Sequence, residues 1–335
     1  MGVIEVAFLG IVFGLIFGII LQRGRICFNS AFRDVKLFKD NYLMKFAALV
    51  IGLQILTFLF FAQMGWITLN PKPFNWVGNI IGGYLFGMGM VLAGGCASGV
   101  TYRSGEGMTT AWFAAIFYGL TAYATKAGVF SGWLKWISKF SVTVEHTEGL
   151  YATKSGPTLS SLFNINPWIV GIIFAAILFW YVFGTKTTER STKLNYKIAA
   201  VILAILAPLA WMSSAASGRN YGFGITGGWI NLFKGFLTGS SLNWEGWEIL
   251  GIIIGAMISA KLAGEFKLRM PKKPITYLQV MVGGVLMGLG AVTAGGCNIG
   301  HFFTGVPQMA ISSLLASLFF ILGNWTMAWI LFGRE

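Results

Sequence analysis

The stretch GGYLFGMGMVLAGGCASG, residues 82–99, decides the fold, because residues 283–300 nearly repeat it as GGVLMGLGAVTAGGCNIG. Each copy is a short apolar run followed by a glycine pair and a single cysteine. Their glycines and cysteines coincide position by position, from Gly82 with Gly283 to Gly99 with Gly300. This many matches are improbable by chance, and they predict one structural element that the chain uses twice.

The composition around these stretches is that of a membrane protein. Of 335 residues, 56% are hydrophobic and only 10% are charged, and the mean hydropathy is +0.72. One or two soluble domains could not bury that much apolar surface. The formal charge of +13 comes from 24 Lys and Arg against 11 Asp and Glu. Because these bases cluster between apolar segments, they indicate membrane topology and contact with lipid headgroups, not nucleic-acid binding.

Nine stretches are apolar enough to be membrane helices. A helix that crosses about 30 Å of hydrocarbon needs roughly 20 apolar residues. We therefore expect an all-α polytopic membrane protein, a single transporter domain over residues 1–335, with helices near residues 3–21, 43–64, 77–93, 109–126, 167–184, 198–212, 247–261, 277–293 and 310–332. Several stretches are short and end in glycine, which indicates broken or re-entrant helices. Glu5 and the lack of a preceding basic segment favour a retained first helix over a signal peptide.

The positions of Lys and Arg predict the orientation. The linkers 22–41, 185–197 and 261–276 are rich in bases and fall on one side if there are nine helices. Basic loops are typically cytoplasmic, so we expect the N-terminus outside and the C-terminus in the cytoplasm. The segments 70–73, 141–166 and 213–246 would lie on the outer side.

With this orientation the two copies of the opening stretch cross the membrane in opposite directions. Inverted repeats of this kind are a recurrent transporter plan, with the substrate site near the midplane between the repeats. We expect halves at approximately residues 1–140 and 165–335. In the first and seventh stretches, Gly14 and Gly18 also match Gly251 and Gly255. That match aligns Cys27 with a glycine, so the third thiol belongs to one half only.

The glycine pairs Gly94–Gly95 and Gly295–Gly296 predict breaks in two helices. Most glycines of a membrane helix only allow close packing. Two adjacent glycines at the end of an apolar run also permit backbone conformations that other residues rarely adopt, so they can end a helix and admit a ligand. A helix that restarts after the pair would direct its free N–H groups at the break, which favours an anion.

The three cysteines Cys27, Cys96 and Cys297 form neither a CxxC motif nor a metal-ligand spacing. We therefore expect no metal site, no cofactor and at least one unpaired thiol. A single buried cysteine is usually just a small apolar residue. Two cysteines at equivalent repeat positions, each directly after a glycine pair, instead favour a functional role.

These features resemble the YeeE/YedE family of bacterial inner-membrane sulfur-compound transporters, in particular its thiosulfate importers. The two GGC segments, the sequence RICF at residues 25–28 and the three separated cysteines carry the resemblance. It implies that Cys27, Cys96 and Cys297 line the substrate path and that thiosulfate is the substrate. It also implies an hourglass shape, a basic depression at the outer mouth and a small TusA-like sulfur-carrier protein as cytoplasmic partner. Other members transport different sulfur or selenium compounds.

Such a path is chemically reasonable for thiosulfate, a small divalent anion with a soft terminal sulfur. Full ionic pairing inside the membrane would hold the anion too tightly to let it pass. Protonated thiols are weak donors that can pass the sulfur along. A thiolate would repel the dianion.

Nearby polar residues have two interpretations each. His301, four residues after Cys297, either donates to the anion or anchors a neighbouring helix. Arg25 either attracts the anion or, as a base in a cytoplasmic linker, sets topology. Asn298 is a candidate cap or turn residue.

Three functions remain open at this point: an importer, a membrane sulfurtransferase that forms a cysteine persulfide, and a redox sensor with a reversible disulfide. The absence of a base beside the thiols disfavours the enzyme, and we favour the importer. The sequence does not reveal an energy source, because it has neither a row of intramembrane acids nor a P-loop.

Overall fold

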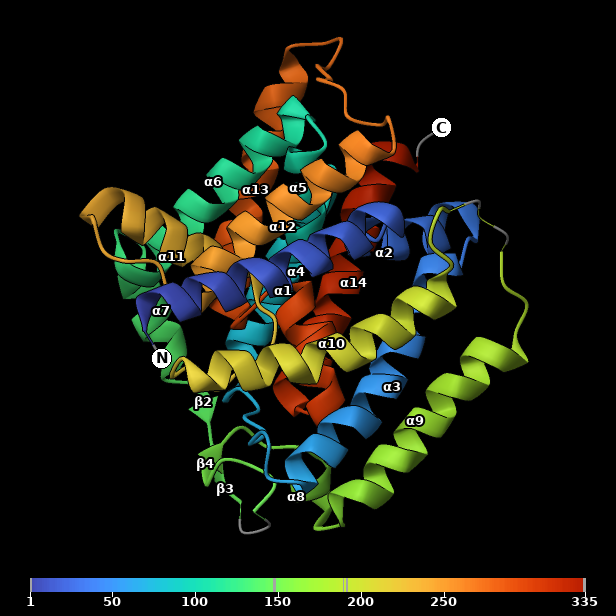
Figure 1. Cartoon of the computed structure of the whole chain (residues 1–335), viewed down its shortest axis with the longest axis vertical. Helices are drawn as coiled ribbons and strands as arrows, with labels where there is room; N and C mark the ends of the chain where they lie inside the picture. The colour runs from blue at the N-terminus through green and yellow to red at the C-terminus, as the bar shows by residue number, and fades with distance from the viewer. Residues whose placement is uncertain (1, 147–148, 189, 191, 334–335) are drawn as a thin grey trace.

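A computed structural model describes residues 2–146, 149–188, 190 and 192–333. These residues form a bundle of helices with two pairs of very short strands (Figure 1). The helices are α1 (Val3–Arg23), α2 (Phe28–Phe38), α3 (Tyr42–Gln63), α4 (Trp76–Leu92), α5 (Ala97–Gly105), α6 (Thr109–Ala127), α7 (Ser131–Ser138), α8 (Leu159–Phe163), α9 (Pro167–Gly184), α10 (Tyr196–Ala216), α11 (Ile225–Thr238), α12 (Trp244–Leu262), α13 (Ile275–Ala294) and α14 (Ile311–Phe332). Between α13 and α14 lie a π-helix, Ile299–Gly305, and a 3₁₀ turn, Val306–Gln308.

The strands tie loops together at one end of the bundle. Strand β1 (Phe74–Asn75) pairs antiparallel with β2 (Ser141–Val142), and β3 (Val144–Glu145) pairs antiparallel with β4 (Lys154–Ser155). The all-α polytopic fold predicted from the composition is therefore confirmed.

Each of the nine predicted stretches coincides largely with a helix, but the number of membrane crossings is not confirmed. Within the described residues, seven segments are long and apolar enough to cross a membrane: Val3–Phe38, Tyr42–Gln63, Trp76–Gly105, Pro167–Gly184, Tyr196–Ala216, Ile275–Gln308 and Ile311–Phe332. Helices α6 and α12 fall outside this set. Helix α12 carries Glu245, Glu248 and Lys261, which make it too charged to qualify.

Helices α4 and α13 pack against each other in the centre through glycine. A Cβ on Gly82 would lie 2.4 Å from the backbone N of Ala294, and one on Gly283 would lie 2.3 Å from the backbone N of Ala93. The contacts run in opposite chain directions, so the helices are antiparallel. The outward faces also correspond, because Gly87 of α4 packs on α14 while Gly288 of α13 packs on α6. This reciprocal packing favours the inverted repeat, which stays a prediction.

Helices α1 and α12 correct one part of the repeat alignment. Gly14 packs against the backbone of Glu248 and Gly18 packs against that of Ile252. Both helices therefore run in the same direction, as Figure 1 also shows. Members of an inverted pair must be antiparallel, so the match of Gly14 and Gly18 with Gly251 and Gly255 marks a packing seam and does not identify equivalent helices.

The loops meet at two ends of the bundle. At one end the three basic linkers contact one another: Arg190 pairs with Asp34 at 2.9 Å, and Lys193 pairs with Glu265 at 2.9 Å. At the other end, the loop after α3 bonds to the segments before α8 and α11, as where Asn70 donates to the carbonyl of Asn220 at 3.1 Å. The expectation that the basic linkers share a side is thus met, and which side is cytoplasmic stays a prediction.

Candidate functional site

The two glycine pairs break their helices as predicted. Helix α4 ends at Leu92, and α5 begins after Cys96, which is its N-cap. Helix α13 ends at Ala294, and the chain resumes as a π-helix. Gly94 has φ +69° and Gly295 has φ +88°, a left-handed conformation that glycine adopts without strain. The glycine pairs therefore end helices α4 and α13, as their positions in the sequence indicate.

The Cys27 and Cys96 side chains lie in direct contact at the first break. The thiol of Cys27 donates to Sγ of Cys96 across 3.7 Å, and the amide of Gly99 donates to the same sulfur across 3.4 Å. Both side chains are buried, and neither is in a disulfide. Cys27, at the start of α2, thus contacts the first GGC segment. The sequence repeat alone does not predict this contact.

Cys297 lies at the second break, in the wall of a pocket of about 190 Å³. The glycines of the break, Gly295 and Gly296, line the same wall. The pocket also holds basic and aromatic residues from distant parts of the chain, namely Lys72, Lys126, Arg219 and Tyr221. Cys297 therefore shares this pocket with three basic side chains and one acid, Glu245.

Lys72 is the cation nearest the second break. Its ammonium donates to the carbonyl of Gly295 and lies 4.7 Å from the ring centre of Tyr221. Burial and, to a smaller extent, the positive charge of Arg219 together lower the pKa of Lys72 to about 8. The charge of this amine is therefore sensitive to mildly alkaline pH.

Arg219 is a second cation of the pocket, and several partners hold its guanidinium in place. It pairs with Glu245 at 2.6 Å and donates to the carbonyls of Tyr221 and Gly222, each at 2.7 Å. Burial raises the pKa of the Tyr221 phenol, whose hydroxyl donates to the carbonyl of Gly300 at 3.0 Å. The pocket therefore combines three cations with the Glu245 carboxylate and the hydroxyl groups of Tyr221 and Thr226.

His301 anchors a neighbouring helix, one of its two interpretations, and its contact with the anion stays a prediction. Its Nδ1 is 2.9 Å from the Ser313 hydroxyl on α14, which anchors the ring to a neighbouring helix. Its Nε2 is buried without a hydrogen-bond partner in the described chain and lies beside Gly296 at the break. Asn298 is also buried, and both of its amide atoms lack a partner among the described residues. Unpaired polar atoms beside the break are suited to contact a ligand.

Arg25 lies at the end of the bundle where the basic linkers meet and is already paired. Its guanidinium contacts Glu106 at 3.0 Å and Glu265 at 2.8 Å, and its backbone has φ +51°. Two carboxylates neutralise it, so an attraction of Arg25 for the anion requires these pairs to open.

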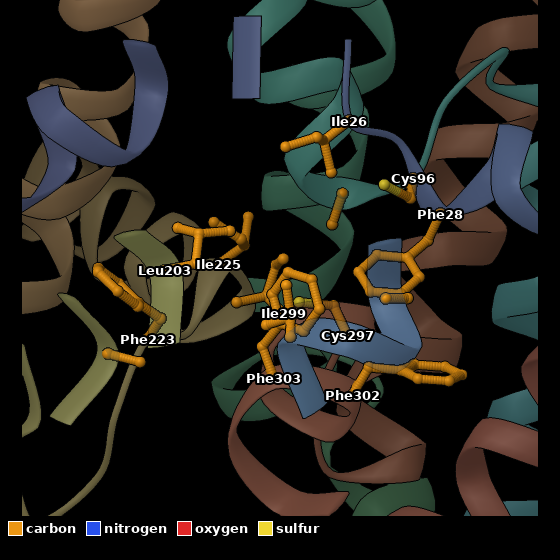
Figure 2. Close-up of a cluster of buried hydrophobic side chains, with 14 of the residues drawn as sticks. Ile26, Phe28, Cys96, Leu203, Phe223, Ile225, Cys297, Ile299, Phe302 and Phe303 are labelled. Atoms are coloured by element: carbon orange, nitrogen blue, oxygen red, sulfur yellow. The ribbon is translucent and has the colours of Figure 1, made fainter. Parts of the chain in front are cut away.

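The three thiols share one buried apolar cluster, and Figure 2 shows Cys96 and Cys297 within it. The hydroxyl of Tyr118, on α6, is buried and lies 2.8 Å from that of Thr226. Cys96 and Cys297 are free thiols and are not bonded to each other. Cys96 has Cys27 as its sulfur neighbour, while Cys297 belongs to the pocket.

Sequence reasoning missed Lys72, Lys126, Arg219 and Tyr221 as individual site residues. A weak signal existed for Lys72, which sits in the rigid NPKP turn at residues 70–73. The others are separated from the GGC segments by long stretches of chain, and only the folded bundle brings them together.

Crossing helices, breaks at buried glycines and a charged pocket that leads to buried polar atoms define a multi-pass membrane transporter. The sulphur transport family matches residues 23–326. The chain is 66% identical over 326 residues to the thiosulfate transporter TsuA of Spirochaeta thermophila, covering 97% of this chain and 99% of that protein. It is 33% identical to the thiosulfate transporter TsuA of Escherichia coli, over 97% of this chain and 94% of that protein. It is 40% identical to the probable transporter YedE of Escherichia coli over 109 residues, which are 31% of this chain and 26% of that protein. The chain belongs to the sulphur transport family and is a transporter, not an enzyme.

Proposed function

We propose that this protein imports thiosulfate across the inner membrane of a bacterium. The observation that carries the proposal is the position of Cys297 in the wall of a pocket that also contains Lys72, Lys126 and Arg219. The cations attract the dianion, and the thiol offers a weak donor to its terminal sulfur. Two relatives that match nearly the whole chain are named thiosulfate transporters, which supports this substrate.

The proposed route runs from the basic pocket past Cys297 to the contacting pair Cys96 and Cys27. A narrow apolar stretch with neutral donors avoids the tight binding that a buried cation would cause. Beside the second break, Nδ2 of Asn298, which has no partner among the described residues, adds a donor, and Nε2 of His301 adds another when it carries the ring proton. The glycines Gly94, Gly95, Gly295 and Gly296 let the backbone approach the anion closely.

The proposal includes an orientation. The pocket faces outward, and the basic linkers face the cytoplasm, with the N-terminus outside and the C-terminus inside. The two inverted halves give the path an hourglass shape. A TusA-like sulfur carrier receives the product at the cytoplasmic end, and lipid covers the outward side chains of helices such as α9, where Ile173 and Trp180 are exposed.

Uptake of labelled thiosulfate by cells or vesicles tests this function. We expect strong loss of uptake in the Cys96→Ala and Cys297→Ala variants, with the protein still folded and present in the membrane. A serine variant at each position is the matched control for size. Sulfate and selenite as competitors define the substrate range within sulfur and selenium oxyanions. Normal uptake by all three Cys→Ala variants would contradict the route.

Mass spectrometry separates import from sulfurtransfer. In the sulfurtransferase alternative, a cysteine thiolate attacks the outer sulfur of thiosulfate, forms a persulfide and releases sulfite. For an importer we expect no stable gain of mass on any cysteine after incubation with thiosulfate. A gain of one sulfur atom on Cys27 or Cys96 would instead support the sulfurtransferase.

A further inference from the structure

Glu248 of α12 is buried inside the bundle. This acid has no role in the proposed route. Its side chain is 0% exposed, and neither carboxyl oxygen has a hydrogen-bond partner in the described chain. Its backbone packs directly under Gly14, within α1. Acidic side chains at such positions in membrane proteins are rare, and they usually serve a function because their burial is unfavourable.

The acid lies directly behind the wall of the basic pocket. Glu245, one helical turn earlier on α12, lines the pocket and pairs with Arg219 at 2.6 Å. The backbone amide of Gly224, which also lines the pocket, faces the Glu248 carboxyl. An anion in the pocket is therefore close enough to Glu248 for the two charges to interact.

Two charged side chains act on Glu248. The ionisable groups that act on its carboxyl are Arg219 and Glu245, and among the described residues α1, α5 and α11 present none. Arg219 is already engaged with Glu245. A carboxyl group in such a place favours its neutral, protonated form, because burial away from water disfavours the charged form.

Anion binding and proton binding at these two places support each other. A dianion in the pocket repels a carboxylate at Glu248, so it favours the protonated form of that side chain. By thermodynamic linkage, the protonated form favours anion binding to the same extent. This mutual dependence is the property that cotransport requires.

We propose that Glu248 is a proton-binding site, and that the transporter carries a proton inward together with the anion. This inference rests on the proposed import of thiosulfate. The interior of a bacterial cell is electrically negative, so a dianion that enters alone moves against the membrane potential. Each proton that travels with it cancels one of its charges and adds the proton gradient as a driving force.

The experiment uses the full-length protein in liposomes that contain a pH-sensitive dye. Potassium and valinomycin clamp the membrane potential, the outer pH is held constant so that Lys72 does not change its charge, and only the inner pH varies. Labelled thiosulfate and inner pH are followed together. The wild type should acidify the lumen as thiosulfate enters, and its accumulation should rise about tenfold per pH unit for each proton carried.

Glu248→Gln keeps the shape of the side chain but cannot bind a proton at this site. We expect this variant to transport thiosulfate without acidifying the lumen and to lose the response to inner alkaline pH. Glu5→Gln, at an exposed acid of α1, is the matched control and should behave like the wild type.

The outcomes are distinguishable. If the wild type moves no thiosulfate, the proposed function fails. If the wild type moves thiosulfate without protons, or if Glu248→Gln still moves both, the proton site is wrong and the transport function stands. If Glu248→Gln does not fold, the wild-type dye signal and a Glu248→Asp variant decide the question.

Discussion

At the scale of single residues, the charge of Lys72 determines how the pocket responds to pH. Because burial lowers its pKa to about 8, the amine is protonated below that pH and becomes neutral as the pH rises through it. We expect the apparent KM for thiosulfate to rise about tenfold between neutral and alkaline outer pH, the effect of losing about 1.4 kcal/mol of attraction. Uptake measured over a series of outer pH values checks this.

The variant Lys72→Arg separates the charge from other effects of pH. An arginine stays protonated over the whole range, so its KM should remain nearly constant where that of the wild type rises. Lys135→Arg, an exchange at an exposed lysine of α7, serves as the control and should keep the wild-type profile. A pH profile of Lys72→Arg identical to that of the wild type would falsify the role of this amine.

Gly99 tests the contact between two thiols. A Cβ at this position would lie 2.7 Å from Sγ of Cys27 and 3.4 Å from Sγ of Cys96. Gly99→Ala should therefore push the thiols apart and lower uptake by about tenfold or more, in line with an overpacking effect of at least about 1 kcal/mol. At the equivalent Gly300, the nearest heavy atom would be Nζ of Lys72 at 3.9 Å, so Gly300→Ala should retain much more uptake. Equal uptake by the two variants would count against the thiol path.

The sequence predicted the thiols and glycines at this scale better than the charges. Cys96 and Cys297 stand out because each has an equivalent cysteine at the same position of the other repeat. Lys72 and Arg219 lie outside the two repeated stretches. A lysine or arginine in a loop ordinarily indicates only the orientation of the protein in the membrane. The loss of hydration that makes Lys72 unusual depends on residues far away in the chain.

At the scale of helices, glycine determines how closely α4 approaches α14. A Cβ on Gly87 would lie 2.4 Å from the carbonyl oxygen of Phe320 and 2.8 Å from the backbone N of Asn324. Backbone atoms cannot rotate away, so Gly87→Ala must separate the helices. We expect a loss of about 1–3 kcal/mol in the free energy of unfolding, read as a lower Tm in detergent.

Gly132→Ala in α7 is the matched control, because no heavy atom lies within 4 Å of its added Cβ. Alanine is the better helix former by roughly 0.5–1 kcal/mol, so this variant should be as stable as the wild type or slightly more stable. A Tm of Gly87→Ala equal to that of Gly132→Ala would show that α4 and α14 can separate without loss of stability.

The sequence predicted the helices well where a single local feature determines them. Apolar runs predicted the long helices, and the glycine pairs predicted their ends. It failed for α1 and α12, whose matching glycines arise from shared packing in a parallel pair. Sequence matching cannot distinguish a glycine that serves a repeat from one that serves a seam, since both need only a small side chain.

At the scale of the whole molecule, an ionic cluster joins three helix ends and a linker at the basic end. Gln22 at the end of α1 donates to Glu106 at 3.1 Å and to Glu265 at 2.8 Å, and Arg25 and Lys193 add the positive charges. The distribution of bases predicted that the linkers meet. It did not predict the carboxylates that hold them, because Glu106 and Glu265 belong to segments that are far apart in sequence.

Removal of Arg25 should loosen this end of the bundle. Glu106 is 1% exposed, and its Oε2 already lacks a partner among the described residues, so Arg25→Ala leaves a buried carboxylate bonded only to Gln22. Because the Arg25 side chain is 42% exposed, the loss of stability should stay below the roughly 3–5 kcal/mol typical of fully buried pairs. Arg25→Ala with Glu106→Gln should regain part of the lost Tm, since no unpaired charge remains. A double variant less stable than Arg25→Ala would refute this account.

The same cluster should make the wild type sensitive to acid. The hydrogen bond from Lys193 lowers the pKa of the Glu265 carboxyl, and Gln22 and Arg25 act in the same direction. A lowered pKa in the folded state means that Glu265 stabilises the protein above about pH 4.3, its unfolded value, and loses this effect as the pH falls through the folded value. The Tm of the wild type should therefore fall more steeply over that acidic window than the Tm of Glu265→Gln. Parallel curves for the two proteins would mean that the carboxylate contributes nothing to holding this end together.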